Sequence, residues 1–204
     1  MRVLVIGAGG DGSSAALIAA RRDFFESMTV ADYDLDRATA LVDRLADPRF
    51  TAAQVDASEA GSVTDLCREH QVTHVLNAVD PRYVVPIFEG AFAAGAHYMD
   101  TAMSLSERHP EQPFTQTGVM LGDRQFAVHD QWVDRGQLAL VGMGVEPGLA
   151  DVFAKYAAEE LFSEIDELGV RDASNLVVHG YDFAPSFSIW TTIEECLNPP
   201  LIWE

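Results

Sequence analysis

Short apolar runs alternate with amphipathic segments over the first 142 residues of the chain. Runs rich in Val, Ile and Leu are typical of strands buried on both faces, and the segments between them place apolar residues at helical spacing. The predicted strands cover residues 2–6, 28–31, 50–55, 73–78, 97–100 and 138–141. The predicted helices cover residues 13–22, 35–46, 59–69, 83–94 and 123–135. This alternation predicts a parallel sheet covered by helices on both faces, and right-handed crossovers give the strand order 3-2-1-4-5-6.

Single residues indicate where two of the predicted helices begin or end, and residues 103–122 depart from the alternation of strands and helices. Ser58 is expected to cap the helix over residues 59–69, and Gly95 is expected to end the helix over residues 83–94. Residues 103–122 are largely polar, contain Pro110 and Pro113 and show no clear period, so we expect a loop or lid there.

From Pro147 onward the pattern changes. We expect a helix from Pro147 to Leu161, exposed antiparallel strands over residues 164–171 and 176–178, and another helix over residues 188–197. The last residues are apolar and no closing element follows them, which suggests a second domain that is cut short.

A glycine-rich turn follows the first strand directly and opens the first helix. Its residues are Gly7, Ala8, Gly9, Gly10, Asp11 and Gly12, in the spacing Gly-x-Gly-x-x-Gly. In such a unit the first glycine permits the tight turn, the second lets the backbone approach a pyrophosphate, and the third lets helix and strand pack closely. The phosphates would bind free backbone N–H groups at the positive end of the helix dipole.

A carboxylate stands where the adenosine ribose of a dinucleotide would lie. Asp32 ends the second strand, twenty residues after Gly12, and can accept hydrogen bonds from that ribose. We therefore predict an α/β fold with a Rossmann-type doubly wound sheet over residues 1–146, which binds a nicotinamide dinucleotide. The alternative is that the glycines form only a tight turn and that Asp32 is a solvated strand end.

Further candidate cofactor-binding residues follow the carboxyl ends of the strands, where ligands bind in open parallel sheets. They are Tyr33, Asp56, Ala57, Asn77, Ala78 and Val79. Asp56 is placed to approach the adenine, and residues 77–79 are placed along the nicotinamide half. Asn77 is equally consistent with a turn former, and Asp80-Pro81 with a helix start.

The loop from Gly142 to Gly148 is a second candidate site. Pro147 is expected at the first helical position, so that the helix N-terminus points into the cleft and suits a substrate carboxylate. Gly144 is expected beside the cofactor. Glu146 is the candidate catalytic residue, which would pair with an amine or accept a proton. The alternative is that Glu146 only stabilises the helix dipole.

Composition restricts the partners and the compartment. A net charge of −19, with Lys155 as the sole lysine, disfavours nucleic acid and anionic membranes. No apolar run is long enough to span a bilayer, and the first strand begins at once without a signal peptide, so we expect a cytoplasmic protein. Cys67 and Cys196 lack paired spacing and a nearby His cluster, so we expect two buried thiols and no metal site.

Five segments, taken in order, carry a family resemblance. They are residues 7–12, Val75–Val79, Ala96–Asp100, Gly142–Gly148 and Trp190–Pro199. Together they make the chain similar to the saccharopine dehydrogenase family. The resemblance implies a Rossmann domain followed by an α/β substrate domain, usually in a homodimer. It also implies hydride transfer between a nicotinamide cofactor and the carbon of an amino acid's C–N bond.

The resemblance narrows the expected cofactor and substrate. Saccharopine reductases typically lack an acid at the end of the second strand because they accommodate a 2′-phosphate. Asp32 therefore favours NAD over NADP. The first arginine after Asp32 in the sequence is Arg37. Lysine 6-dehydrogenase looks most similar, so we expect an amino-acid substrate such as lysine or saccharopine. The alternatives are a carboxynorspermidine or opine-type reductase and a non-catalytic dinucleotide-binding module. Because family members are nearly twice as long, residues 147–204 would begin an incomplete substrate and dimerisation domain.

Overall fold

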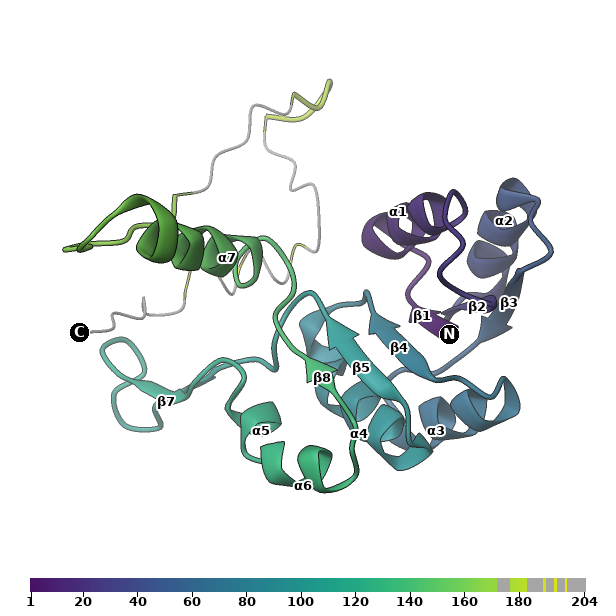
Figure 1. Ribbon diagram of the computed structural model, residues 1–204, viewed down its shortest axis with the longest axis horizontal. Helices are drawn as coiled ribbons and strands as arrows, with labels where there is room; N and C mark the ends of the chain where they lie inside the picture. Colours follow the sequence, from purple (N-terminus) through teal and green to yellow (C-terminus); the bar gives the residue numbers. More distant parts are fainter. Residues whose placement is uncertain (172–176, 183–188, 190–192, 194–196, 198–204) are drawn as a thin grey trace.

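The computed structural model describes residues 1–171, 177–182, 189, 193 and 197 (Figure 1). Its centre is a six-stranded sheet in the order β3-β2-β1-β4-β5-β8. The strands are β1 (Arg2–Ile6), β2 (Ser27–Asp32), β3 (Phe50–Gln54), β4 (His74–Asn77), β5 (His97–Asp100) and β8 (Ala139–Leu140). Every neighbouring pair is parallel. The predicted Rossmann-type sheet and its strand order are therefore confirmed.

Helices lie on both sides of this sheet. The described α-helices are α1 (Gly10–Ala19), α2 (Leu35–Leu45), α3 (Ala60–Glu69), α4 (Val84–Ala94), α5 (Asp123–Phe126), α6 (His129–Asp134) and α7 (Leu149–Tyr156). A 3₁₀ turn, Pro81–Tyr83, precedes α4, and a π-helical turn, Ala157–Leu161, follows α7. Figure 1 shows α1 and α2 above the sheet and α3 and α4 below it. Gly95 ends α4 in the left-handed conformation, as predicted.

The first strand shows why the sheet needs both helix layers. Val3 and Val5 pack into a cluster with residues of α1 and α2, whereas Leu4 and Ile6 pack into a cluster with residues of α3 and α4. Successive side chains of a strand point to opposite faces, so a continuous apolar run buries itself only when both faces are covered. This arrangement fixes the glycine-rich turn, which follows Ile6, at the carboxyl edge of the sheet.

Two predictions between residues 58 and 122 are wrong. Ser58 does not cap α3; it donates from both its backbone N and its Oγ to Asp56 Oδ1, and α3 begins at Ala60. The segment expected to be a loop contains a short antiparallel hairpin of β6 (Glu107–Arg108) and β7 (Thr117–Val119). A Cβ atom at Gly118 would lie 2.7 Å from the Arg108 carbonyl oxygen, so glycine lets the two strands approach.

The predictions after residue 122 are also revised. The helix expected over residues 123–135 is divided into α5 and α6, because Val128 leaves helical geometry with φ −110° and ψ 16°. The next helix begins at Leu149 behind Gly148, so Pro147 precedes it instead of occupying its first position. Residues 164–171 are exposed and form no strand. Of the strand expected over residues 176–178, Val177 and Val178 are described and form no strand, whereas residue 176 lies outside the described part. The helix expected over residues 188–197 falls mostly on residues outside the described part.

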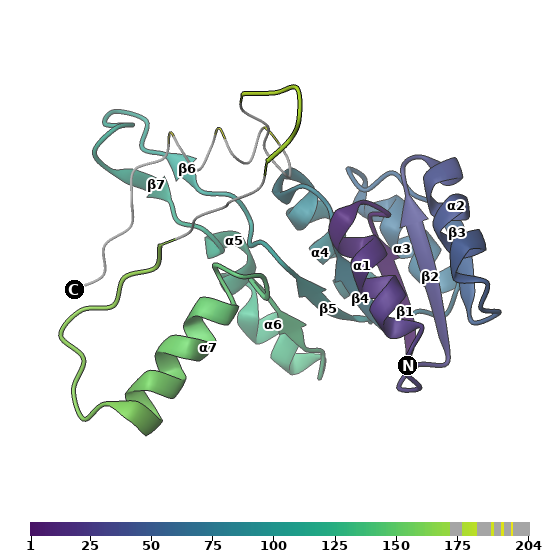
Figure 2. The same ribbon diagram turned by 90° about the horizontal axis from the view of Figure 1, so that it is seen from above.

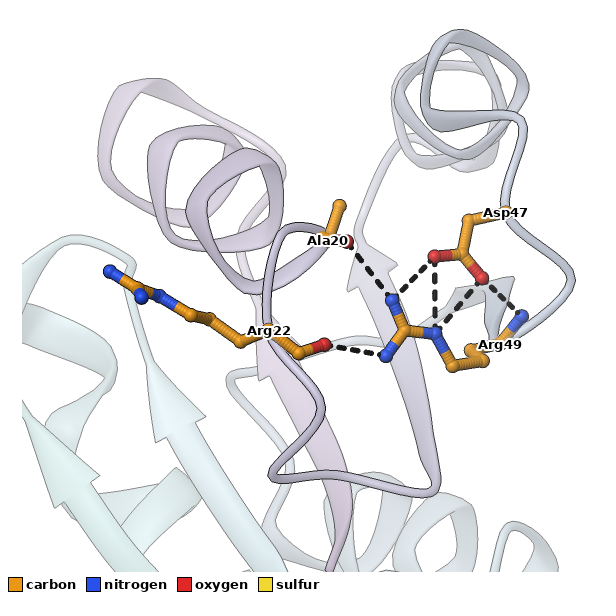
Figure 3. Close-up of polar contacts among 4 residues, drawn as sticks. All are labelled: Ala20, Arg22, Asp47 and Arg49. Atoms are coloured by element: carbon orange, nitrogen blue, oxygen red, sulfur yellow. Dashed lines mark hydrogen bonds and ion pairs between the residues drawn. The ribbon is translucent and has the colours of Figure 1, made fainter.

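Arg49 connects several segments at the amino edge of the sheet, which is the edge opposite the glycine-rich turn. Figure 3 shows the Arg49 guanidinium between the Asp47 carboxylate and the carbonyl oxygens of Ala20 and Arg22. Its centre also lies 4.4 Å from the ring centroid of Phe25. Arg49 therefore ties the end of α1 to the turn between α2 and β3.

The described residues contain neither a membrane-spanning helix nor a cluster of metal-ligating side chains. None of the helices found there is long and apolar enough to cross a membrane. Within the same residues, no group of three or more His, Cys, Asp or Glu side chains is placed to hold a metal ion. Cys67 is a buried free thiol, whereas Cys196 lies outside the described part of the chain.

Candidate dinucleotide-binding site

Of the four glycines in the turn after β1, Gly7, Gly9 and Gly12 form the Gly-x-Gly-x-x-Gly spacing and differ in what surrounds them. Gly7 has φ +106°, and a Cβ atom there would lie 2.6 Å from the Ala78 carbonyl oxygen. A Cβ atom at Gly12 would collide with the Gly7 carbonyl oxygen. At Gly9, by contrast, and at the neighbouring Gly10, a Cβ atom would meet no protein atom within 4 Å. Protein packing therefore explains Gly7 and Gly12 but leaves open space beside Gly9, as a passing pyrophosphate requires.

The backbone after Gly9 supplies donors for an anion. Gly9 is the N-cap of α1, and Gly10 is its first helical residue. The first N–H groups of a helix have no intrahelical acceptor, and the dipole there favours negative charge. Asp11 lies in this first turn and is exposed, so its carboxylate can point into solvent.

Asp32 is buried at the end of β2 and bonds to the glycine-rich turn itself. Its Oδ2 accepts from the Ala8 N–H at 2.8 Å, and its Oδ1 accepts from the Asp34 N–H at 3.0 Å. Each carboxylate oxygen can accept more than one hydrogen bond, so these contacts leave capacity for a ribose hydroxyl. The sequence indicated the ribose role but not this second one, in which Asp32 fixes the shape of the turn.

A groove of about 540 Å³ runs along the carboxyl edge beside these residues. Among the residues predicted from sequence, Gly7, Gly9, Asp32, Tyr33, Asp56, Ala57, Ala78 and Val79 line it. Its other lining residues are Ile6, Arg37, Val55, Ser58, Asp80 and Tyr83. Hydrogen bonds from the Ser58 side chain and backbone lower the pKa of Asp56. The groove is thus lined by the carboxylates of Asp32, Asp56 and Asp80 and by the cationic side chain of Arg37.

Other predicted site residues do not line the groove. Ala8, Gly10, Asp11 and Gly12 belong to the turn behind it. Asn77 is buried; its Oδ1 accepts from the Val79 N–H at 3.2 Å, and its Nδ2 donates to Tyr98 Oη at 3.0 Å. The turn-forming role of Asn77 is therefore present, and Asn77 supports the groove from behind. Asp80 caps the 3₁₀ turn by accepting from the Arg82 N–H and also lines the groove.

The loop from Gly142 to Gly148 lies farther along the same edge. Gly144 packs so closely that a Cβ atom would collide with the Thr101 carbonyl oxygen, and the Gly144 carbonyl accepts from the Leu149 N–H at 2.9 Å. Glu146 is exposed in this loop. Neither Gly144 nor Glu146 lines the 540 Å³ groove, so the described residues do not bring them into one pocket with Gly9 and Asp32.

A buried polar network connects this loop to the end of β4. Asp100 is 1% exposed and accepts hydrogen bonds from Gly142 N, Tyr98 Oη and Gln125 Nε2. Burial raises the pKa of Asp100, and the hydrogen bonds from its donors oppose that shift. Burial also raises the pKa of Tyr98. Sequence reasoning missed Tyr98, Asp100 and Gln125. The available signal was that Tyr98 and Asp100, which both carry polar atoms, occupy alternate positions of β5 and therefore share one face of the sheet.

Comparison with known proteins decides the family. The family model described as "Saccharopine dehydrogenase NADP binding domain" matches residues 3–140, which is more than half of the chain. The chain belongs to the saccharopine dehydrogenase family. The resemblance inferred from five sequence motifs is therefore confirmed.

Two curated relatives show sequence identities of 28–30% to this chain. The chain is 30% identical over its whole length to the carboxynorspermidine synthase of Vibrio cholerae serotype O1 and covers 50% of that protein. It is 28% identical over 95% of its length to the carboxyaminopropylagmatine dehydrogenase of Synechocystis sp. and covers 46% of that protein. The chain thus spans about half the length of these curated relatives.

A solved structure shares the fold. The apo saccharopine dehydrogenase (L-Glu forming) of Saccharomyces cerevisiae aligns with a TM-score of 0.59 at 17% identity, over 78% of this chain and 31% of that chain. At this identity the likeness concerns the fold alone.

Proposed function

We propose that this chain forms the dinucleotide-binding part of an NAD(P)-dependent oxidoreductase that acts on a C–N bond. The observation that carries the proposal is the groove at the carboxyl edge, where Gly9 leaves open space beside the N-terminus of α1 and Asp32 lines the wall. A bound nicotinamide ring would supply the hydride chemistry. The residues of this chain would bind the phosphates through backbone N–H groups and orient the adenosine ribose through Asp32.

The proposed cofactor is NAD rather than NADP. Asp32 is bonded to two backbone N–H groups, which keeps a carboxylate at the place where a 2′-phosphate would have to lie. Against this stand the wording of the family model, which refers to NADP, and Arg37, which lines the same groove. Calorimetry with NADH and NADPH at one salt concentration should give the tighter affinity for NADH.

Arg37→Ala provides the control for this choice. NADH affinity should change little, because Arg37 is not needed for a free 2′-hydroxyl. The NAD proposal is wrong if the unaltered chain binds NADPH as tightly as NADH and Arg37→Ala then weakens NADPH alone.

The proposed substrate class is a carboxylated amine of the kind for which the two relatives are named, in preference to lysine or saccharopine. Both relatives are similar to this chain over at least 95% of its length. From the sequence alone, lysine or saccharopine is the first expectation and this class is the alternative. The domain boundary near residue 146 and a homodimeric assembly stay predictions.

The substrate proposal needs a kinetic comparison. The protein expressed from its complete gene would be assayed with carboxynorspermidine, saccharopine and lysine, following the absorbance of the reduced nicotinamide. We expect kcat/KM to be at least about tenfold higher for carboxynorspermidine, because a pocket built for it leaves its own polar groups unpaired when a substrate with a different arrangement of amines and carboxylates binds. A preference for lysine or saccharopine would restore the first expectation, and no turnover of any of the three would favour the non-catalytic module.

Glu146 is proposed as the group that holds the substrate ammonium or accepts its proton. Asp151 also contributes to the competing role, stabilisation of the α7 N-terminus, because its Oδ2 accepts from the Gly148 N–H at 2.8 Å. In the same kinetic assay, Glu146→Gln should lower turnover by at least about tenfold with NAD affinity unchanged. Unchanged turnover with a lower melting temperature would show that Glu146 serves the helix instead.

A further inference from the structure

Asp100 is the most deeply buried carboxylate among the described residues. Its Oδ1 accepts from Gly142 N at 2.6 Å, and its Oδ2 accepts from Tyr98 Oη and Gln125 Nε2, both at 2.8 Å. Its own carbonyl oxygen accepts from Met143 N at 2.8 Å. A buried carboxylate is tolerated only when donors of this kind surround it. Asp100 therefore holds the first two residues of the Gly142–Gly148 loop by both its side chain and its backbone.

The Asp100 carboxylate is also connected, through Tyr98 and Asn77, to the loop after β4. Tyr98 Oη, which donates to Asp100, accepts from Asn77 Nδ2 at 3.0 Å. Asn77 Oδ1 in turn accepts from the Val79 N–H, and Val79 lines the groove. In a doubly wound sheet a dinucleotide crosses from the first half of the sheet to the second, so Val79 belongs to its nicotinamide end. One buried side chain thus connects both loops at that end.

The donor pattern explains why this position requires a carboxylate. Gln125 Oε1 accepts from Ser104 N at 2.8 Å, which turns Gln125 Nε2 toward Asp100. Gly142 N can only donate, and the Tyr98 hydroxyl donates because its oxygen already accepts from Asn77. Asp100 must accept on both oxygens. An asparagine has only one acceptor oxygen. Its NH₂ group would face one of the donors, and neither of these two groups would then have an acceptor.

We propose that Asp100 is a positioning residue, which holds the loop after β4 and the loop after β8 in the relative arrangement that binds the nicotinamide end of the dinucleotide. This role rests on the proposed function. It requires no contact between Asp100 and the cofactor. It assigns the adenosine end to Asp32 and the glycine-rich turn, and the nicotinamide end to the network through Asp100.

The test compares two ligands that differ at that end. NADH carries the nicotinamide ring, whereas ADP-ribose occupies the adenosine and pyrophosphate sites without it. We expect the unaltered 204-residue chain to bind both. Asp100→Asn should weaken NADH binding about tenfold, while ADP-ribose affinity changes by less than about twofold. The fluorescence of bound NADH should also shift toward that of free NADH, because the ring is no longer held.

Two further variants separate positioning from simple loss of stability. Asp47→Asn removes a hydrogen-bonded carboxylate at the opposite edge of the sheet and should leave both affinities unchanged even where it lowers the melting temperature. The double variant Asp100→Asn with Gln125→Glu restores an acceptor opposite the new amide and should recover part of the NADH affinity.

The outcomes distinguish this proposal from the proposed function. Equal losses of NADH and ADP-ribose affinity in Asp100→Asn, or no loss of either, would overturn the positioning role while dinucleotide binding stands. Absence of recovery in the double variant would overturn it too. Failure of the unaltered chain to bind either ligand would overturn both proposals.

Discussion

Helices α2 and α7 are similar amphipathic segments in very different surroundings. In α2, Ala38 and Leu41 are buried against β2 and β3. In α7, no residue is buried, and Leu149, Val152, Phe153 and Tyr156 are each between 46% and 63% exposed. Figure 2 shows α2 beside the sheet, whereas α7 lies beyond α6, away from it. An amphipathic pattern therefore predicts that a helix forms, but it does not say what covers its apolar face.

This difference extends to whole regions of the chain. Each strand of the six-stranded sheet except the short β8 contributes buried side chains to the two clusters. From Leu149 to Arg171, every residue is half-buried or exposed. We infer that the stability of the described chain resides in the sheet region, since the apolar area removed from water is there.

A matched pair of leucines tests this inference with the largest expected effect. Leu41→Ala in α2 removes a side chain that is 5% exposed and should lower the free energy of unfolding by about 2–5 kcal/mol. Leu149→Ala in α7 removes a side chain that is 46% exposed and should change the free energy of unfolding by no more than about 0.5 kcal/mol. Urea unfolding followed by circular dichroism measures both. Equal losses would mean that α7 is packed as tightly as α2.

Thiol labelling gives a second measure of the same contrast. Burial raises the pKa of the Cys67 thiol to about 12, so it is both inaccessible and un-ionised at pH 8. In a Cys196→Ser background, Cys67 should react with a thiol reagent at least about a hundredfold more slowly than a cysteine introduced by Ala158→Cys after α7. Rates within a factor of about three of one another would contradict the assignment of α3 to the stable region.

The ion pair of Arg49 with Asp47 is expected to have the smallest effect on the free energy of unfolding, and this effect depends on pH. Hydrogen bonding to Arg49 lowers the pKa of Asp47. A carboxyl whose pKa is lower in the folded state adds stability above its ordinary pKa of about 3.9, and this stability is lost as the pH falls through the lowered folded value. Arg49→Met should reduce stability slightly at pH 7 and flatten its acid dependence. Unchanged acid dependence in urea titrations would mean that the ion pair in Figure 3 contributes nothing measurable.

Much of the sheet region could be predicted from sequence because its signals are local. The apolar run of β1, the Gly7–Gly12 turn and Asp32 each follow from residues adjacent in the chain. The bonds of Asp100 to Gln125 and Gly142 cross 25 and 42 residues, so no local pattern encodes them. The second bond of Asp32, to Ala8, also depends on how two strands pair.

The region after β8 could be predicted less well for the same reason. Its apolar residues have helical or alternating spacing, but the described residues supply no packed neighbour to fix a strand over residues 164–171. Pro147 fits the first position of a helix by its φ angle, yet α7 begins behind Gly148, whose φ of +128° is unfavourable for other residues.

Calorimetric titration of NADH into three forms of the chain tests the central claim most directly. The forms are the unaltered chain, Gly9→Val, and the control Gly61→Val at an exposed glycine where a Cβ atom also meets nothing within 4 Å. We expect NADH to bind the unaltered chain and the control with affinities within about twofold. Gly9→Val should abolish binding with an unchanged circular dichroism spectrum, because its side chain takes the place of the pyrophosphate. Binding of NADH to Gly9→Val as tight as to the unaltered chain would contradict the account, since the glycine-rich turn would then be a turn and nothing more.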